Sequence, residues 1–199
     1  DYMDISIEEL VKKYDDTLYK YFRGLEPDEA EQNIQSRIRG NILMALSNKF
    51  NWMVLSTGNK TELALGYCTL YGDMNGGLSV ISDLSKLDVY SLSKWINHKH
   101  PNRIPEGSIT KAPSAELAED QVDPFDYSIV SPLVDELVGG IKNRDELISD
   151  GYDPKLIDEI SGQIRLNEFK RRQSAPGLKI SRKAFGIGRR MPIVSKYKG

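Results

Sequence analysis

Two short apolar runs, each followed by a polar turn and then by a helical pattern, constrain the fold more than any other feature of the chain. Residues 52–55 (Trp-Met-Val-Leu) lead into Ser-Thr-Gly, and residues 78–81 (Leu-Ser-Val-Ile) lead into Ser-Asp-Leu-Ser. Compact apolar runs bounded by turn residues predict buried strands, and strands that alternate with helices form parallel sheets. We therefore expect an α/β fold, with a parallel sheet, helices on both of its faces and ligands at the carboxyl ends of its strands.

Apolar residues at helical spacing predict the elements around this sheet. Ser85 with Asp88 three positions later resembles a capping box, which marks a helix start. No internal repeat is visible, so we expect one domain over residues 1–199. We expect helices over 7–22, 27–46, 85–95 and 156–172, and a further short strand over 5–7.

Charge is distributed unevenly along the chain. The 27 Lys and Arg against 29 Asp and Glu give a net charge of −2, which excludes a globally basic nucleic-acid binder. Residues 169–199, however, hold ten basic side chains and no acidic one, which leaves −12 on the rest. We define 169–199 as the basic tail, which either binds a polyanion or only folds back on the body.

The cysteine content and the length of the apolar runs indicate the cellular environment of the protein. The single cysteine, Cys68, cannot form an internal disulfide, which favours a reducing, cytoplasmic location. No apolar run approaches the length of about 18 residues that would suggest a membrane span, so we expect no membrane partner.

The polar segment after the first predicted strand, residues 56–62, is a candidate ligand site. Its Thr57 hydroxyl and the free N–H groups at the helix start suit a nucleotide, and Glu62 suits Mg²⁺ held beside phosphate oxygens. The alternative is purely structural, with Asn59 capping the helix and Glu62 favouring its dipole. The residues alone leave both interpretations open.

Three other features carry weaker signals. Asn33 and Arg37 lie four residues apart on one helical face, where Arg37 either binds phosphate or carboxylate or is only solvated. In the glycine-rich segment 71–77, Asp73 could recognise an amine, unless the segment is a plain turn. Lys86 opposes the dipole of the helix it begins, which indicates either a phosphate partner or an ordinary surface lysine.

Several segments, in order and over nearly the whole chain, resemble the synthetase domain of NAD synthetases, and the glutamine-dependent branch most closely. They are residues 31–39 (EQNIQSRIR), 55–67 (LSTGNKTELALGY), 71–77 (YGDMNGG), 83–86 (DLSK), 113–117 (PSAEL) and 168–173 (EFKRRQ). The resemblance implies an adenine nucleotide alpha-hydrolase-like fold.

The resemblance also implies an activity, that of a carbon–nitrogen ligase. ATP adenylates the carboxylate of nicotinic acid adenine dinucleotide, and ammonia then displaces AMP to give NAD. It implies ATP and Mg²⁺ as cofactors, a homo-oligomer, and ammonia that a glutamine-hydrolysing domain supplies. Two alternatives stay open: a non-catalytic module that binds nucleotide or supports assembly, and an amidotransferase that adenylates another carboxylate.

Roles for individual residues follow from the same resemblance. The residues implied are Thr57, Lys86 and Ser114 for ATP; Asn33, Arg37, Glu62 and Lys170 for the dinucleotide; Glu62 for Mg²⁺; and Asp73 and Lys86 for catalysis. On this interpretation Lys170, which opens the basic tail, brings that tail over polyanionic substrates.

The chain departs from the family in one respect. The family binds ATP phosphates with a Ser-Gly-Gly-x-Asp-Ser loop after its first strand, and the 199 residues contain no such motif. Residues 1–7 instead look like a later strand. We therefore expect a domain that is incomplete at its amino end, without the first strands and phosphate loop, and part of a longer enzyme. By itself it should have little or no synthetase activity, and a bared sheet edge should favour association.

Overall fold

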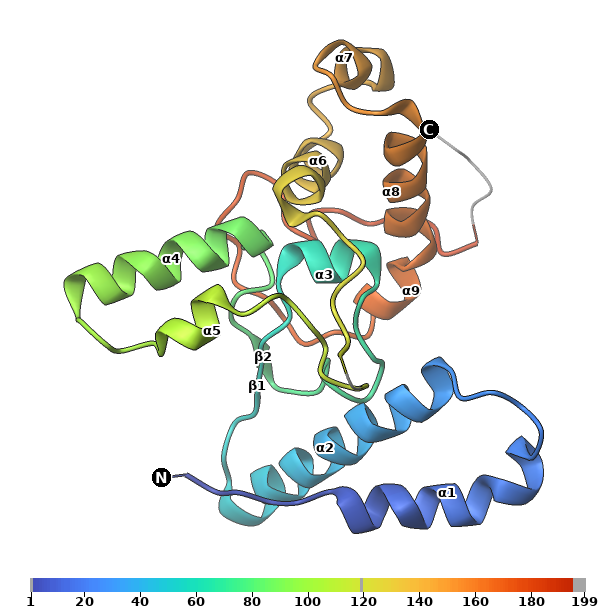
Figure 1. The fold of residues 1–199 in the computed structure, drawn as a ribbon. Coiled ribbons are helices and arrows are strands. Elements are labelled where there is room, and N and C mark those ends of the chain that lie inside the picture. Colours follow the sequence, from blue (N-terminus) through green and yellow to red (C-terminus); the bar gives the residue numbers. More distant parts are fainter. Residues whose placement is uncertain (1, 119, 195–199) are drawn as a thin grey trace.

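The computed structural model describes residues 2–118 and 120–194, which form a helix-rich α/β fold around a small parallel sheet (Figure 1). The hairpin of α1 and α2 lies at one end, α3 and the sheet lie in the middle, and α6, α7 and α8 lie at the other end. The elements are α1 (Glu8–Phe22), α2 (Glu29–Phe50), β1 (Leu55–Ser56), α3 (Lys60–Leu65), β2 (Leu78–Ser79), α4 (Lys86–Lys99), α5 (Glu106–Thr110), α6 (Tyr127–Gly139), α7 (Arg144–Ser149), α8 (Pro154–Leu166) and α9 (Glu168–Arg171).

The sheet confirms the predicted parallel arrangement but is much shorter than expected. Within the described residues it has two strands, and Leu55 of β1 lies opposite Leu78 of β2. Helix α3 makes the crossover between them, as parallel strands require. Beyond β2, the Ser79 N–H donates to Pro176 O at 2.8 Å, and Ser79 forms a parallel bridge with Gly177. The start of the basic tail therefore continues the sheet.

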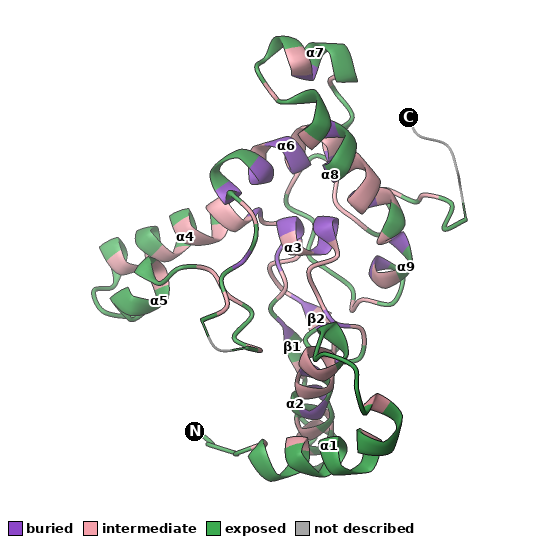
Figure 2. Ribbon diagram, turned by 45° about the vertical axis from the view of Figure 1, so that its right-hand side comes forward, coloured by how far each residue is buried: buried purple, intermediate pink, exposed green. Residues whose placement is uncertain are grey.

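The core lies on one side of the sheet, where α3, α6, α7 and α8 meet (Figure 2). Leu133 and Val134 of α6 and Leu147 of α7 have no exposed surface, and Ile157 and Ile160 of α8 pack against them. These residues recur at three- to four-residue spacing, so each helix turns one apolar stripe inward. Burial of such side chains stabilises the fold by roughly 1.5–3 kcal/mol for each residue.

Helix α2 packs against the glycine-rich segment 71–77 on the other side. Ser36 and Gly40 are buried in this contact. A side chain at Gly40 would come within 2.9 Å of the Gly72 carbonyl oxygen, and one at Gly72 within 2.2 Å of Ser36 Oγ. Both glycines are therefore required by the close approach of helix and loop rather than by an unusual backbone conformation.

The predicted helix starts are confirmed where capping residues specify them. The Asp88 N–H donates to Ser85 Oγ at 3.1 Å, and the Ser85 N–H donates to Asp88 Oδ2 at 3.2 Å, so the capping box at α4 is present. The predicted helix over 156–172 divides at Asn167 into α8 and α9. None of the helices in the described part of the chain combines the length and apolar character needed to cross a bilayer.

Two strand predictions were wrong. Among the described residues, 2–7 form no strand, and Ile5 is 46% exposed. Residues 52–54 likewise precede β1 as irregular chain, with Trp52 and Met53 about half or more exposed. A parallel strand needs a hydrogen-bonded neighbour, and β1 has a strand beside it on only one edge in the described structure. Pairing with the segment before β2 begins only at Val54, whose O accepts a hydrogen bond from the Gly77 N–H at 2.9 Å, so the rest of the apolar run stays outside the sheet.

This free edge leads to the expectation that the chain associates in solution. Leu55 is 51% exposed on β1. The nearby Trp52 ring stacks on the Phe50 ring, with ring centroids 4.7 Å apart. Exposed apolar side chains therefore surround the unpaired backbone groups of this edge. Light scattering after gel filtration should give a mass above 22.5 kDa that rises with concentration and changes little with salt. Leu55→Lys should lower the mass toward that of a monomer.

Leu25→Lys is the matched control, because Leu25 is 70% exposed in the turn between α1 and α2, away from β1. It should leave the association unchanged. A monomer at every concentration and salt, or equal effects of the two substitutions, would contradict the role assigned to the β1 edge.

Candidate functional site

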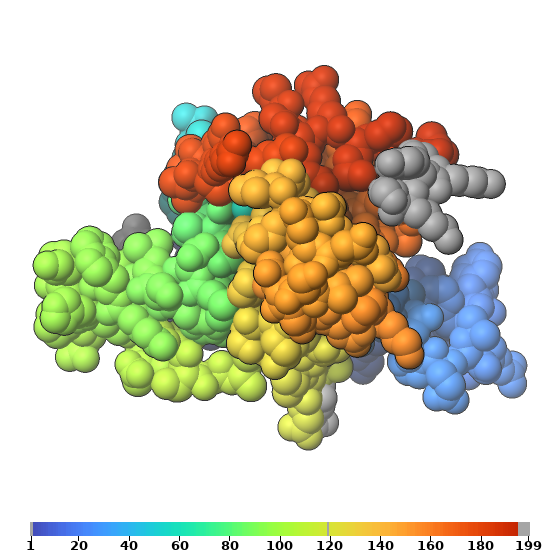
Figure 3. Space-filling view, turned by 90° about the horizontal axis from the view of Figure 1, so that it is seen from above, coloured from blue at the N-terminus to red at the C-terminus, as the bar shows by residue number. Residues whose placement is uncertain are grey.

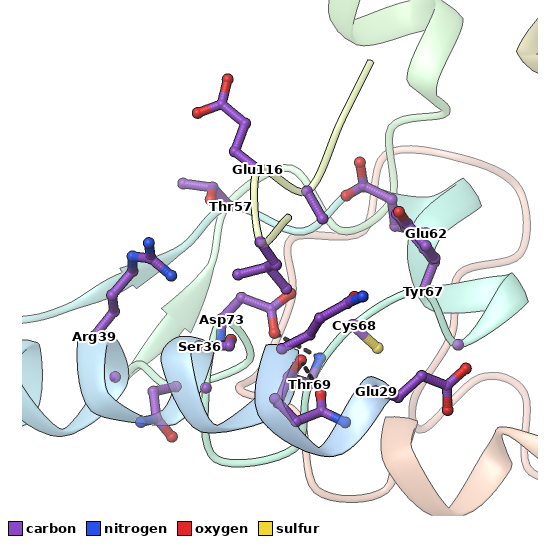
Figure 4. Close-up of a pocket in the computed structure, with 18 of the residues that line it drawn as sticks. Glu29, Ser36, Arg39, Thr57, Glu62, Tyr67, Cys68, Thr69, Asp73 and Glu116 are labelled. Carbon is purple, nitrogen blue, oxygen red and sulfur yellow. Dashed lines mark hydrogen bonds between the residues drawn. The ribbon is translucent and has the colours of Figure 1, made fainter. Parts of the chain in front are cut away.

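A cavity of about 560 Å³ lies between α2, the carboxyl end of β1, α3 and the segment before α6 (Figure 4). It is where a parallel α/β fold is expected to bind a ligand, beyond the carboxyl ends of its strands. Figure 4 shows Thr57 and Glu116 at one side of this cavity, Glu62 and Tyr67 at a second, and Asp73 between them above α2. Segments far apart in the sequence therefore meet at one site.

The turn from β1 into α3 presents the Glu62 carboxylate to this cavity. Its Oε2 accepts a hydrogen bond from the Asn59 N–H at 3.1 Å, and Asn59 Oδ1 accepts one from the Glu62 N–H at 3.1 Å. Its Oε1 lies 2.8 Å from the Lys86 ammonium at the start of α4. The capping role and the ligand-facing position are thus compatible, because different carboxylate oxygens serve the helix and the lysine.

Asp73 is held on the floor of the cavity by its own loop and by α2. The Thr69 N–H donates to Asp73 Oδ1 at 2.6 Å, the Thr69 hydroxyl donates to Asn33 Oδ1 at 2.7 Å, and the Asp73 N–H donates to Ser36 Oγ at 3.1 Å. Asp73 is exposed to solvent on the side of the cavity, although protein atoms surround its carboxylate closely enough to desolvate it in part. This desolvation raises the pKa of Asp73 above its usual value, although the hydrogen bond from Thr69 acts in the opposite direction.

Cys68 and Lys170 lie beside Asp73. Burial, and next the charge of Asp73, raise the pKa of the Cys68 thiol to about 12, so the thiol is a poor nucleophile at neutral pH. The Lys170 ammonium donates to Gly66 O at 2.7 Å and to Cys68 O at 2.9 Å. These bonds use two of its three N–H groups, which leaves one for a ligand.

The segment before α6 brings Ser114 to the far wall of the cavity. Ser114 Oγ accepts a hydrogen bond from the Glu116 N–H at 3.0 Å, and Leu117 O accepts one from Gln35 Nε2 at 3.1 Å. The second bond ties the segment to α2. Ser114 is half-buried and lines the cavity with Leu117.

Most of the residues predicted from the sequence meet at this cavity. Lys86 is outside its lining but reaches it through the ion pair with Glu62. Arg37 is exposed, lies outside the lining, and donates from Nε to Leu70 O at 3.2 Å. The predicted residues that do line the cavity are Asn33, Thr57, Glu62, Asp73, Ser114 and Lys170.

Arg39 lines the cavity where Arg37 does not, and helix geometry explains the difference. The cavity-facing stripe of α2 runs through Ser36 and Gly40. A helix turns by about 100° per residue, so Arg37 points away from Ser36 while Arg39, three positions later, returns to its face. No signal in the sequence identified which face of α2 turns to the cavity, because that depends on what packs against Ser36 and Gly40. Tyr67, Cys68, Gln121 and Asp123 also line the cavity and were not predicted.

The basic tail lies mostly away from the cavity. Figure 3 shows the C-terminal segment along one side of the body, against the region of α6 and α8. Of its described basic residues, Lys170 alone lines the cavity, and the polyanion interpretation has no further support there. The predicted tail also includes Lys196 and Lys198, which lie outside the described residues.

A buried carboxylate, Asp83, fastens this tail. It accepts hydrogen bonds from the Ile180 N–H at 2.7 Å, the Ser181 N–H at 2.6 Å and the Ser181 hydroxyl at 2.7 Å, and lies 3.7 Å from the Lys60 ammonium. Burial alone would raise the pKa of Asp83, but these hydrogen bonds and the charge of Lys60 lower it below its usual value. The ionised form therefore holds the tail in place.

Acid should loosen this attachment. A carboxyl group whose pKa is lowered on folding stabilises the folded state above its unfolded pKa, and this contribution is lost as the pH falls through the folded pKa. Urea unfolding from pH 7 down to pH 3 should therefore show a fall in stability at acidic pH that is smaller in Asp83→Asn. Asp16→Asn removes an exposed carboxylate on α1 and should give a profile parallel to that of the unmodified chain. A parallel profile for Asp83→Asn would contradict the anchoring role.

The Glu62 carboxylate can supply only part of the ligand set that Mg²⁺ requires. Within the described residues no three His, Cys, Asp or Glu side chains are close enough to hold a metal ion. Mg²⁺ is, however, commonly bound by one or two carboxylates together with substrate phosphates and waters. A single carboxylate on the cavity wall, beside a cation able to pair with phosphate, fits that partial role.

Comparisons with known proteins agree with this geometry. The family model described as NAD synthase matches residues 1–174. The chain is 45% identical over 196 residues to the glutamine-dependent NAD(+) synthetase of Synechocystis sp., and 46% identical over 198 residues to that of Thermotoga maritima. These alignments cover 97% and 98% of the chain but 35% and 34% of the relatives. The chain therefore spans about a third of the length of the curated relatives it matches.

Solved structures give the same result. One is the glutamine-dependent NAD+ synthetase from Acinetobacter baumannii in complex with adenosine diphosphate. The match covers 94% of this chain and 34% of that one, with 38% sequence identity and a TM-score of 0.52. The synthetase from Cytophaga hutchinsonii has a TM-score of 0.78 over 98% of this chain and 34% of its own, and at 23% identity supports the fold alone. These matches confirm the expected α/β fold class.

Proposed function

Because the chain belongs to the NAD synthase family, we propose that it supplies a large part of the active site of a glutamine-dependent NAD synthetase. The reaction is the ATP-dependent amidation of nicotinic acid adenine dinucleotide. The carboxylate of the nicotinic acid group attacks the α-phosphorus of ATP, pyrophosphate leaves, and ammonia then displaces AMP from the acyl adenylate. A cytoplasmic location, where the free thiol of Cys68 stays reduced, and a homo-oligomeric enzyme are part of the proposal.

One observation carries this proposal: hydroxyl, carboxylate and ammonium groups from separate segments of the chain line a single cavity. Thr57, Glu62, Asp73, Ser114 and Lys170 all contribute to it. A substrate that combines phosphates, sugar hydroxyls and a carboxylate needs this mixture of donors and acceptors.

Thr57 and Ser114 are proposed to bind ATP with their hydroxyl groups, from opposite segments of the cavity wall. Asn33 and Lys170 are proposed to bind the dinucleotide, and the third N–H of the Lys170 ammonium is the group available for it. Arg37 is exposed and outside the cavity lining, so a contact from it requires a ligand that extends beyond the cavity. Arg39 is the guanidinium that lines the cavity itself.

Three charged residues are proposed to act on the reacting groups. Lys86, released from Glu62, would pair with the phosphates, and Glu62 would then be free to hold Mg²⁺. When bound, Mg²⁺ supplies charge stabilisation at the transferring phosphate. Asp73, whose pKa is raised, is the proposed group that accepts a hydrogen bond or proton from the attacking ammonia, since a weaker acid ionises to a stronger base.

The chain is proposed to act within a longer enzyme. It spans about a third of its curated relatives and contains no Ser-Gly-Gly-x-Asp-Ser motif, so residues outside it would complete the phosphate site, and a glutamine-hydrolysing domain would supply ammonia. The same observation favours the second candidate, a segment that binds nucleotide without catalysing turnover by itself.

Calorimetry with the purified chain tests the proposal. Mg·ATP and nicotinic acid adenine dinucleotide should each bind at one site per chain, and nicotinic acid mononucleotide should bind more weakly because it lacks the adenylate half. No binding of ATP or dinucleotide at about 1 mM, which corresponds to roughly 4 kcal/mol of binding free energy, would reject the proposed site. AMP and NAD formation by the chain alone, with ammonia, would instead reject the part of the proposal that requires further chain.

A further inference from the structure

The segment that carries Ser114 forms a closed loop, and Asp123 closes it. The Asp123 N–H donates to Pro113 O at 2.9 Å, which joins the two ends of the loop next to Ser114. Within the loop, the Leu117 N–H donates to Gln121 Oε1 at 2.9 Å. The described residues of this loop form no helix or strand, so these bonds, together with that from Gln35 of α2 to Leu117 O, help to fix the position of Ser114.

The Asp123 side chain fastens the closed end of this loop to the core. Asp123 is 9% exposed, and its Oδ2 accepts a hydrogen bond from the Tyr127 hydroxyl of α6 at 2.7 Å. Tyr127 is 6% exposed, so this bond is made inside the protein. Burial, and next the Asp123 carboxylate, raise the pKa of the Tyr127 hydroxyl, which therefore stays protonated and able to donate.

Tyr67, which follows the C-terminal cap of α3, lies near the same carboxylate. Burial, and next the interaction with Asp123, raise the pKa of Tyr67 to about 12. The rings of Tyr67 and Phe125 meet edge to face with centroids 5.5 Å apart, and Phe125 and Tyr127 are 6.1 Å apart. Asp123 Oδ1 is buried and accepts no well-aligned hydrogen bond within the described residues. Of these three aromatic residues, only Tyr127 of α6 makes a well-aligned hydrogen bond to the carboxylate, while Tyr67 and Phe125 lie in the segments next to α3 and α6.

From these contacts we infer that Asp123 is a positioning residue for the ATP site, because its N–H closes the loop that holds Ser114 and its carboxylate joins that loop to α6. This inference extends the proposed function by assigning a residue that acts through Ser114 rather than on the substrate. It does not depend on the loop opening or closing.

Hydrogen exchange measured on the whole chain tests the anchoring step without any ligand. In Asp123→Asn, exchange of the amides at Leu117 and at position 123 should become roughly threefold faster, because the neutral amide oxygen of asparagine accepts the Tyr127 hydrogen bond more weakly than the carboxylate does. Asp120→Asn is the matched control, because it makes the same substitution at an exposed position of the same loop. Its exchange should match that of the unmodified chain. Unchanged exchange in Asp123→Asn, or an equal increase in the control, would overturn the inference.

Tyr127→Phe covers the case in which Asp123→Asn fails to fold, which circular dichroism would detect. It removes the hydroxyl donor to Asp123, so the whole hydrogen bond to a charged group is lost, and it should speed the same exchange by about tenfold. Exchange at Leu117 and Asp123 that stays at the unmodified rate in Tyr127→Phe would also overturn the inference.

Calorimetry with Mg·ATP tests whether Asp123 acts through Ser114. Asp123→Asn and Ser114→Ala should each weaken binding, and the double variant should bind no more weakly than the worse single variant, because the effects are not independent. Additive losses would show that Asp123 does not act through Ser114. If the unmodified chain binds no ATP, the proposed function fails, while the exchange measurements still decide whether Asp123 anchors the loop.

Discussion

Replacing Arg171 with methionine is expected to lower the free energy of unfolding by about 3–5 kcal/mol, the typical cost of breaking a buried ion pair from one side. Arg171 is 7% exposed. Its guanidinium donates to Leu63 O at 2.9 Å and to Ala64 O at 3.2 Å, at the carboxyl end of α3, and also to Ile164 O of α8. It lies 3.2 Å from Glu168 Oε2, and Glu168 is 4% exposed.

The large effect follows from what the substitution leaves behind. Methionine fills much of the same space but donates no hydrogen bond, so three buried carbonyl groups lose a donor and Glu168 keeps a buried negative charge with one partner fewer. The contact of the guanidinium with the Phe185 ring, at 4.5 Å, is lost as well. Urea unfolding followed by circular dichroism measures the change in the free energy of unfolding, provided that the dependence of this free energy on urea concentration has the same slope in both proteins.

The neighbouring arginine provides the control for this measurement. Arg172 pairs with the same Glu168, through Nε at 3.0 Å, but its side chain is 43% exposed. Because the Arg172 side chain is largely solvated and donates to none of the three buried carbonyl groups, Arg172→Met should cost less than Arg171→Met. Equal losses from the two substitutions would show that burial and the three carbonyl bonds do not determine the role of Arg171.

Replacing Glu62 with glutamine is expected to weaken binding of Mg·ATP by at least about tenfold, because hydrogen bonds and ion pairs with a charged partner contribute roughly 1.5–3 kcal/mol. Glutamine retains an oxygen that can accept the Asn59 N–H, so the start of α3 should be preserved. It loses the negative charge proposed to face Mg²⁺ and to balance Lys86, whose ammonium is 2.8 Å away. Calorimetry measures the affinity, and a thermal melt checks that the fold is unchanged.

Glu116→Gln is the control for the loss of charge at the same cavity. Glu116 also lines the cavity, but its side chain is 64% exposed and pairs with Lys111 on the surface. This substitution should change the affinity by no more than about threefold, since exposed pairs contribute little. A larger loss of Mg·ATP affinity in Glu116→Gln than in Glu62→Gln would contradict the proposal that Glu62 is the carboxylate facing Mg²⁺.

Local sequence signals predicted the parts of this site that depend on neighbours in the chain. The capping residues Asn59 and Ser85 begin the helices where expected, since a capping box involves groups three residues apart. Thr57 and Asp73, in the polar segments beside the two strands, do line one cavity. The strand lengths were overestimated, because apolar runs such as 52–55 do not reveal whether another strand pairs with them.

Contacts between distant segments could not be predicted in this way. The pair of Glu62 and Lys86, the carbonyl groups that Lys170 binds, and the interaction of Tyr67 with Asp123 each join residues from different segments. Arg39 was missed although it is only two residues from Arg37, because the cavity-facing side of α2 is decided by what packs against Ser36 and Gly40.

Sequence by itself predicted helices α1 to α4, the region of α8 and α9, and the family of this chain, because propensity, capping and apolar periodicity act within a few residues and motifs preserve their order. It did not predict α5, α6 or α7, although α6 and α7 contribute to the core. Only the tertiary structure decided which side chains share the cavity, which cations already have partners, and which buried carboxylates fasten the loop and the tail. Those outcomes depend on how rigid elements pack in three dimensions, and a one-dimensional pattern does not contain the distances between groups that lie tens of residues apart.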